Sequence, residues 1–175
     1  MYRFIFIALS AVLFSSCKNI VPYTDALRKQ QNWSEDQVKT IQFYLSSPII
    51  LQRKVTDASS DIVAGTIKIV NGQKIDEVII SSGTPGILVN ENNNLFNISF
   101  EKGDDYTLQF GNNQYMDYHY SLAFSDIKNS IGKVYYNGTE YYTSPESLNA
   151  ILMVDLRKIN KTQLNQRTAE GRKVK

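Results

Sequence analysis

Two Asn-Gly dipeptides, each lying in a region where apolar and polar residues alternate, constrain the fold of this chain more than any other feature. Asn71-Gly72 separates residues 65–70 from residues 74–80, and Asn137-Gly138 lies in a second region of this kind. An Asn-Gly pair between stretches of period two is the strongest local signal for a β-hairpin, because both residues tolerate the positive φ angles of a tight turn. The sequence therefore predicts antiparallel β structure.

The register of the first hairpin is predicted by matching the faces of its strands. A loop over residues 71–73 places Ile69 opposite Ile75 and Lys68 opposite Asp76. A shorter loop of two residues would pair apolar with polar side chains. We therefore expect the longer loop.

The hairpin at Asn137-Gly138 is expected to have a two-residue loop, which separates its side chains into two faces. The face expected in the core holds Val134, Tyr136 and Tyr141. The face expected in solvent holds Lys133, Tyr135, Glu140 and Tyr142.

A third hairpin is predicted around the polar residues 102–104, because strict alternation precedes and follows them. The predicted cross-strand pairs are Phe96 with Phe110, Ile98 with Leu108, and Phe100 with Tyr106. One face of this hairpin is therefore expected to form a continuous apolar seam in the core.

Helices are predicted before the first strands. Thr24 and Asp25 are suited to cap a short helix over residues 26–31. Ser34 and Gln37 have the spacing of a capping box, in which each side chain bonds the other residue's backbone amide. We expect the second helix to continue to near Ser46, because Pro48 follows.

Polar clusters predict the remaining turns. Pro85-Gly86 suits the central positions of a type II turn, residues 90–94 are predicted to be a polar loop, and residues 111–113 to break the chain. Residues 151–156 are mostly apolar and fit either a central strand or a buried helix end, because periodicity does not separate the two.

Together these segments predict a mainly β (α+β) fold. We expect a single antiparallel β barrel or sandwich of about eight short strands with N-terminal helices. This single β-rich domain should span residues 25–160, since a chain of 175 residues is long enough to bury one core.

Residues 1–16 have the composition of an export signal peptide. Arg3 supplies a short positive region, and residues 4–14 are apolar apart from Ser10. This run is shorter than the ~20 residues of a membrane-spanning helix and fits the hydrophobic region of a secretory signal. With the small residues before Cys17, the leader resembles a bacterial lipobox, and the chain is similar to uncharacterised envelope lipoproteins of Gram-negative bacteria. The resemblance implies cleavage before Cys17 and lipidation of that cysteine.

Lipidation also explains the unpaired thiol, because Cys17 is the only cysteine and has no intramolecular disulfide partner. Residues 17–24 are then expected to be the lipid anchor and tether. The residues after the cysteine, 18–21, include no acidic side chain. By analogy with other lipoproteins, this favours the outer membrane with the domain facing the periplasm. We expect a lipid-anchored protein of the cell envelope.

The sequence contains no recognisable catalytic or metal-binding pattern. His119 is the only histidine, and strand alternation places it on the outer face, opposite Tyr120. Asp104-Asp105 lacks the spacing of a calcium loop and is predicted to be a solvated turn. Nucleophile-elbow and phosphate-binding motifs do not occur. We therefore expect no enzymatic activity, no metal and no cofactor, and at a net charge of +2 we expect no nucleic-acid partner.

Tyrosines supply the candidate binding surface. Tyr115, Tyr118, Tyr135 and Tyr142 are predicted to be exposed. Exposed aromatic rings stack on sugar rings, which are plentiful in a cell envelope, so these residues suggest a glycan-binding surface. The alternative stays open that tyrosine is frequent here only because strands favour it.

Residues 161–175 are predicted to be a flexible basic tail, because they lack an apolar period and bury too little surface to offset the entropy of ordering. Basic side chains near a membrane are attracted to anionic lipid. The tail is also suited to contact an anionic polymer or an acidic partner. The basic residues assigned to it are Arg167, Arg172, Lys173 and Lys175.

Three functions are compatible with the sequence. The leading hypothesis is a non-enzymatic accessory or binding module that holds an envelope protein or glycan, with the membrane as its second partner. The alternatives are a carrier that encloses an apolar ligand in its β core and, less favoured, an envelope hydrolase. An internal cavity would favour the carrier, and a closed core with exposed tyrosines would favour the binding module.

Overall fold

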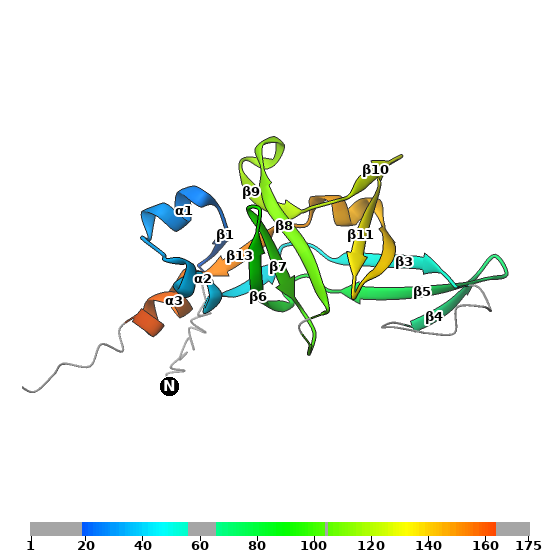
Figure 1. Ribbon diagram of the computed structural model, residues 1–175, viewed down its shortest axis with the longest axis horizontal. Coiled ribbons are helices and arrows are strands. Elements are labelled where there is room, and N and C mark those ends of the chain that lie inside the picture. The colour runs from blue at the N-terminus through cyan, green and yellow to red at the C-terminus, as the bar shows by residue number, and fades with distance from the viewer. Residues whose placement is uncertain (1–18, 56–65, 104, 164–175) are drawn as a thin grey trace, which may run out of the picture.

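Two antiparallel sheets make up most of the computed structural model, which describes residues 19–55, 66–103 and 105–163 (Figure 1). In spatial order, sheet A consists of β1 (Ile20–Pro22), β13 (Leu152–Asp155), β2 (Gln42–Leu45), β6 (Pro85–Asn92), β7 (Leu95–Ser99), β8 (Thr107–Asn113) and β9 (His119–Leu122). Sheet B consists of β10 (Asp126–Lys128), β11 (Ile131–Tyr136), β12 (Thr139–Thr143), β3 (Ile49–Lys54), β5 (Gln73–Ile80) and β4 (Thr66–Val70). The thirteen strands exceed the predicted number because several have only three or four residues, too few to show a period.

The sheets form a sandwich-like arrangement rather than a closed barrel. Sheet A curls until β9 approaches residues beside its opposite edge, but only single bridges form there, Thr24 with His119 and Ser121 with Ile151. The predicted mainly β, antiparallel fold is therefore confirmed, and of the two predicted architectures the sandwich is the one observed.

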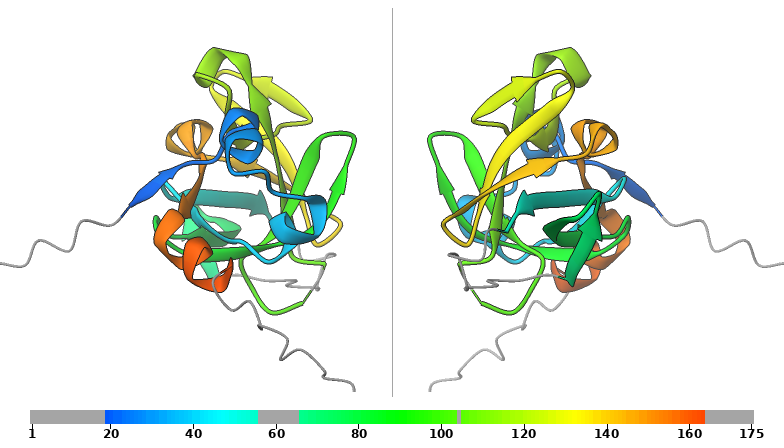
Figure 2. Two further views of the ribbon diagram at one scale, coloured as in Figure 1. Left: turned by 90° about the vertical axis from the view of Figure 1, so that its left-hand side faces the viewer. Right: turned by 90° about the vertical axis from the view of Figure 1, so that its right-hand side faces the viewer.

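Short helices lie between the strands of the described chain and, in the case of α3, after the last one. The α-helices are α1 (Asp25–Gln30), α2 (Glu35–Lys39) and α3 (Leu156–Gln163), and the 3₁₀ helices are η1 (Gln114–Met116) and η2 (Pro145–Asn149). The β8–β9 turn, which contains η1, and helix α3 lie on opposite sides of the molecule in both views of Figure 2, as they do in Figure 1.

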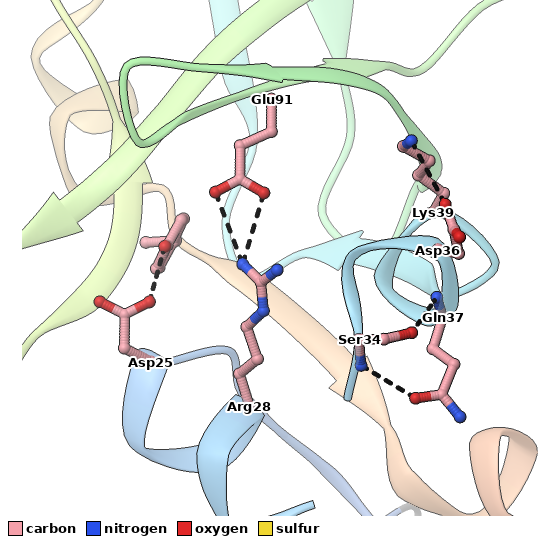
Figure 3. Close-up of polar contacts among 8 residues, drawn as sticks. Asp25, Arg28, Ser34, Asp36, Gln37, Lys39 and Glu91 are labelled. Carbon is pink, nitrogen blue, oxygen red and sulfur yellow. Dashed lines mark hydrogen bonds and ion pairs between the residues drawn. The ribbon is translucent and has the colours of Figure 1, made fainter. Parts of the chain in front are cut away.

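Both predicted helix starts are confirmed. Thr24 Oγ1 accepts a hydrogen bond of 3.0 Å from the amide of Leu27 at the start of α1. At α2, the Gln37 amide donates to Ser34 Oγ at 3.3 Å and the Ser34 amide donates to Gln37 Oε1 at 2.9 Å (Figure 3). This reciprocal pair satisfies two amides that otherwise lack helical partners.

The prediction that the second helix reaches Ser46 is wrong. Helix α2 ends at Lys39, and Gln42–Leu45 forms β2 between β13 and β6. Phe43 and Leu45 are buried and Tyr44 is half-buried, which is the period of a strand. The apolar residues of this stretch fit the period of a helix as well as that of a strand. Pairing with β13 on one side and β6 on the other favours the strand.

The predicted apolar seam lies at the centre of the core. Phe96 pairs with Phe110 and Ile98 with Leu108, as expected, and all four side chains are buried. Phe100 and Tyr106 lie beyond the last ladder pair and are only partly buried. The inner face of sheet B completes the core with Ile49, Leu51, Val78, Ile80, Val134, Tyr136 and Tyr141.

An aromatic cluster fills the interior of the curled sheet A. The Tyr23 ring centroid lies 4.9 Å from that of Tyr120 and 5.4 Å from that of Phe96. Phe43 and Trp33 complete the cluster, with centroids 5.3 and 6.3 Å from that of Tyr23. Such edge-to-face and offset packing stabilises aromatic pairs beyond the area that they bury.

The predicted register of the first hairpin is wrong. Ile69 pairs with Lys74 and Val70 with Gln73, so the loop has two residues, Asn71 and Gly72, both with positive φ (50° and 76°). β4 is the edge strand of sheet B, and Ile69 is 76% exposed. Because that side chain is mostly exposed, face matching does not constrain the register and the geometry of the turn decides it.

Three other turns differ from prediction. Pro85-Gly86 begins strand β6 instead of forming a turn, and the reversal occurs earlier, at Ser82-Gly83. The loop predicted over 90–94 shrinks to Asn93-Asn94, because β6 and β7 extend to either side of it. Residues 111–113 do not break the chain but continue β8. In each case a longer ladder provides backbone hydrogen bonds to residues that were expected to be in loops.

The hairpin at Asn137-Gly138 is as predicted, with Tyr136 paired to Thr139 across a two-residue loop. Residues 151–156, which fitted strand or helix, contain β13. The predicted domain boundary at residue 160 falls within α3, which continues to Gln163. The leader, Cys17 and the rest of the tail, with Arg167, Arg172, Lys173 and Lys175, lie outside the described residues.

Candidate functional site: a groove of tyrosine and amide side chains

Three of the four candidate tyrosines line two adjoining hollows on the surface. Tyr115 and Tyr118 line a hollow of about 510 Å³, and Tyr135 lines one of about 280 Å³. The hollows share Leu95, Ala123 and Phe124 as a common wall. We call this pair of hollows the tyrosine–amide groove. It runs from the β8–β9 turn to the start of the β11–β12 loop.

The β8–β9 turn displays the first two tyrosines in a constrained conformation. Tyr115 is 89% and Tyr118 62% exposed. Asp117 and Tyr118 have φ angles of 51° and 59°, a left-handed conformation that is rare for a bulky side chain. The amide of Tyr118 donates to the carbonyl of Asn113 at 3.0 Å, which holds the turn in this shape. Strain of this kind is concentrated at functional positions.

Amide side chains line the floor of the groove. Asn97 and Gln109 form a cross-strand pair on β7 and β8, and Gln109 Nε2 donates to Asn97 Oδ1 at 3.2 Å. Asn97 Nδ2 then donates to Asn90 Oδ1 on β6 at 2.6 Å. Gln114 and Asn137 line opposite ends, and neither side chain makes a hydrogen bond within the described part of the chain. The side-chain amides of Gln114 and Asn137 can therefore exchange hydrogen bonds with a ligand.

Two glycines allow the apolar wall of the groove to lie close to the sheets. A Cβ at position 111 would lie 2.6 Å from Leu95 Cδ2, and a Cβ at position 132 would overlap the Phe124 ring. Both glycines are in strands, β8 and β11, and both are buried. The absence of a side chain there lets Leu95 and Phe124 pack flat against the backbone.

The groove carries little charge. Asp105 is the one ionisable acid among the described residues that line it, and no lysine or arginine is among them. Tyrosine, phenylalanine and amide groups supply the rest of the chemistry. This combination suits an uncharged ligand that offers both apolar faces and hydroxyl or amide groups.

Tyr142 does not line the groove, although it is the diagonal neighbour of Tyr135 across β11 and β12. It contributes to a different hollow, with Gln52, Lys54 and Ile131, on sheet B. Its hydroxyl donates to Glu140 Oε1 at 2.6 Å, and Lys133 Nζ lies 3.2 Å from Glu140 Oε2. Hydrogen bonds from Tyr142 and then Lys133 lower the pKa of Glu140, so the Glu140 carboxylate stays charged beside Lys133. The predicted four-tyrosine surface is therefore a three-tyrosine groove plus a separate residue.

Helix α1 is fixed to the strands beside the groove by polar contacts. Asn112 Nδ2 donates to Asp25 Oδ2 at 2.7 Å, and Tyr120 OH donates to Asp25 Oδ1 at 2.7 Å. Arg28 reaches from α1 to Glu91 on β6, with 3.3 Å between Nη1 and Oε2 (Figure 3). Burial, and then the bond to Asp25, raise the pKa of Tyr120 far above its ordinary range. Asn112 belongs to both the groove and this network.

The other residues considered from sequence form no site in the described chain. His119 is half-buried rather than fully exposed, paired with Asn113 in the β8–β9 ladder. No group of three or more histidine, cysteine, aspartate or glutamate side chains is positioned to hold a metal among the described residues. Asp104 lies outside them.

Several groove residues, and one glycine behind them, were not identified from the sequence: Leu95, Asn97, Gln109, Gly111 and Phe124, with Gly132 behind Phe124. For Asn97 and Gln109 a signal existed, because the predicted pair of Ile98 with Leu108 also places these amides side by side. For Phe124 and Gly132 the contact forms across the short β10–β11 hairpin, which the sequence did not predict.

Comparison with protein-family models, curated proteins and solved structures gave no match. In the part of the chain that the structure describes, every helix is too short or too polar to cross a membrane. The groove itself is therefore the main guide to function.

Proposed function

We propose that the protein is a non-enzymatic binding module of the bacterial cell envelope, anchored by lipid at Cys17 on the periplasmic side of the outer membrane, that holds a neutral glycan in the tyrosine–amide groove. The observation that carries the proposal is the convergence of Tyr115, Tyr118 and Tyr135 on one groove with free amides and almost no charge. The basic tail provides a second, electrostatic contact with the envelope.

The chemistry of a sugar chain explains the composition of the groove. Pyranose rings present apolar C–H faces to aromatic rings, and their hydroxyl groups exchange hydrogen bonds with amides such as Gln114 and Asn137. The hollows adjoin across Phe124 and Leu95, so the groove has the form of a track for an extended chain rather than a pocket for one small molecule. The absence of lysine and arginine among the described lining residues argues against an acidic ligand.

The packing of sheet A weighs against the carrier alternative. A carrier needs space inside the β core, and that position is occupied by the rings of Tyr23, Phe43, Phe96 and Tyr120. The hydrolase alternative gains no specific support, because no hydrogen bond joins the His119 ring to a hydroxyl group among the described residues. The binding module is therefore the function that we favour.

Calorimetric titration of the mature protein with neutral oligosaccharides of hexoses and N-acetylhexosamines tests the glycan proposal. We expect binding by the wild type, and a loss of about tenfold or more in Tyr115→Ala and Tyr135→Ala, the usual effect of removing an aromatic contact at a binding centre. Tyr142→Ala is the matched control, since its ring is exposed but outside the groove. Equal losses in all three variants, or no binding by the wild type, would reject the groove as the site.

Acyl labelling tests the anchor separately. Cys17→Ser should abolish incorporation of labelled fatty acid and release or mislocalise the protein, because the thioether needs the cysteine sulfur. Unchanged labelling of this variant would contradict the proposed anchor but would leave the glycan-binding measurement unaffected.

A further inference from the structure

The N-terminal end of the described chain lies beside the start of its last helix, α3. The amide of Leu156, at the start of α3, donates to the carbonyl of Asn19 at 3.2 Å, and β1 pairs with β13, the strand before α3. Cys17 precedes Asn19 by two residues, and an extended residue spans at most ~3.6 Å. A membrane that holds Cys17 must therefore lie close to this end of the molecule.

A hollow of about 530 Å³ opens at the same end. Ile20 and Met153 form its apolar part, and Tyr44 on β2 pairs with Met153 across the ladder. Arg157 and Lys158, on the first turn of α3, form its basic part. An apolar floor with tyrosine and basic side chains is the composition found where proteins meet the headgroup layer of a membrane.

The two cations are held in place by neighbouring side chains. Lys158 Nζ donates to Tyr44 OH at 2.6 Å and lies 5.1 Å from the centre of the Tyr44 ring. This hydrogen bond raises the pKa of Lys158, so its ammonium stays charged at neutral pH. Arg157 Nε donates to Asp155 Oδ1 at 3.4 Å. Its Nη1 and Nη2 atoms make no hydrogen bond to any described residue, so the outer side of the guanidinium remains open.

Asp155 orients Arg157 through contacts to its backbone amide and its side chain. Among the described residues of the lining it is the one acid, beside two cations, and its Oδ1 also accepts from the Arg157 amide at 3.1 Å. A phosphate group matches this arrangement, because arginine binds phosphate through two parallel donors and lysine through a point charge.

We propose that this hollow binds the phosphate-bearing headgroup of an anionic phospholipid in the membrane to which Cys17 is attached. The inference rests on the lipid anchor of the proposed function and adds a second, specific membrane contact. It orients the domain, because α3 and the β8–β9 turn lie on opposite sides of the molecule (Figure 2). The tyrosine–amide groove, which begins at that turn, then faces away from the membrane.

Hydrogen exchange of the acylated full-length mature protein tests the proposal. The protein is reconstituted into vesicles of phosphatidylcholine alone or of phosphatidylcholine with phosphatidylglycerol. Peptides that cover α3 and the Ser82–Gly83 turn, which also lines the hollow, should exchange more slowly only when phosphatidylglycerol is present. The double variant Arg157→Gln/Lys158→Gln should lose this lipid-dependent slowing completely. Lys29→Gln/Lys39→Gln, with the same change in charge on α1 and α2, should keep it.

Further arms separate the alternatives. Loss of the slowing in Arg172→Gln/Lys173→Gln/Lys175→Gln, but not in the Arg157 and Lys158 variant, would assign the contact to the tail and overturn the proposal. Slowing by inorganic phosphate with neutral vesicles would overturn the assignment to lipid. Mass spectrometry of the Cys17 peptide distinguishes the two levels of failure. An unacylated cysteine rejects the anchor and this site together, whereas an acylated protein without lipid-dependent slowing rejects the headgroup site alone.

Discussion

The hydroxyl of Tyr120 donates a hydrogen bond of 2.7 Å to Asp25 Oδ1, between residues 95 positions apart in the chain. Tyr120 lies on β9, and its ring packs 4.6 Å from that of Phe96, centroid to centroid. Asp25 is the first residue of α1. One side chain thus connects the aromatic interior of sheet A to the helix that follows the N-terminal strand.

We expect Tyr120→Phe to lower the free energy of unfolding by about 1.5 kcal/mol, because it removes a hydrogen bond to a charged group while leaving the ring in place. Urea denaturation measures the change. Tyr115→Phe is the control, since that hydroxyl is on an exposed side chain, and we expect no change there. An unaltered midpoint for Tyr120→Phe would show that the Asp25 contact adds nothing to stability.

Phe96 should be the most sensitive position in the apolar seam. Its ring is fully buried against Tyr23, Phe43 and Tyr120. We expect Phe96→Ala to cost about 3–5 kcal/mol, the range for truncating a core aromatic. Phe100→Ala should cost less, because Phe100 lies past the end of the ladder and is only partly buried. If Phe96→Ala does not fold, Phe96→Leu and Phe100→Leu should show the same order of destabilisation with smaller values. A larger loss of stability at Phe100 than at Phe96 would contradict the prediction.

Glu77 should make stability depend on pH in the acid range. Hydrogen bonds from Lys68 and then Gln52 hold the pKa of Glu77 below its ordinary value, and Gln52 Nε2 lies 2.6 Å from Glu77 Oε2. Because the folded pKa is lowered, the stabilisation is complete above the unfolded pKa of about 4.3 and is lost as the pH falls through the folded pKa. Denaturation curves between neutral pH and pH ~3 should show this loss, which Glu77→Gln removes. The exposed control Glu35→Gln should follow the wild type.

Gly132 and Phe124 should behave as an energetically coupled pair. A methyl group at position 132 overlaps the Phe124 ring, so we expect Gly132→Ala to destabilise by about 1–3 kcal/mol, as overpacking does. In the Phe124→Ala background the same change should cost almost nothing, which gives a coupling energy of about 1 kcal/mol or more in a double-mutant cycle. Gly132→Ala combined with the exposed Tyr135→Ala is the control, and we expect the two destabilisations to add. Additive effects for Gly132→Ala and Phe124→Ala as well would mean that the Phe124 ring does not pack against Gly132.

The parts of the fold that were predicted correctly are those where local pattern and burial agree. The pairs of Phe96 with Phe110 and Ile98 with Leu108 follow from alternation alone, because one face of each strand has to enter the core. The helix starts at Thr24 and Ser34 were found because capping depends on a few adjacent residues.

The errors occur where a distant segment decides. Residues 42–45 become a strand because β13 and β6 leave a place between them, and no local signal records that vacancy. The register of β4 follows its turn because Ile69 is mostly exposed, so its burial does not select a register. The candidate site was anticipated at its exposed tyrosines, but the Phe124 part of its wall was missed because it packs on Gly132 across the β10–β11 hairpin, which was not predicted.

The pairing of β1 with β13 has a mechanical consequence. β1 is three residues long, and Tyr23, at the centre of the aromatic cluster, follows it directly and donates its amide to Leu152 at 2.9 Å. Tension between an acylated Cys17 and the body of the protein would therefore enter through this short ladder. A force along β1 shears the ladder and loads its hydrogen bonds together. A force across β1 unzips the ladder and breaks the hydrogen bonds one at a time from Ile20. The attachment is thus strongest when the load runs parallel to the strand.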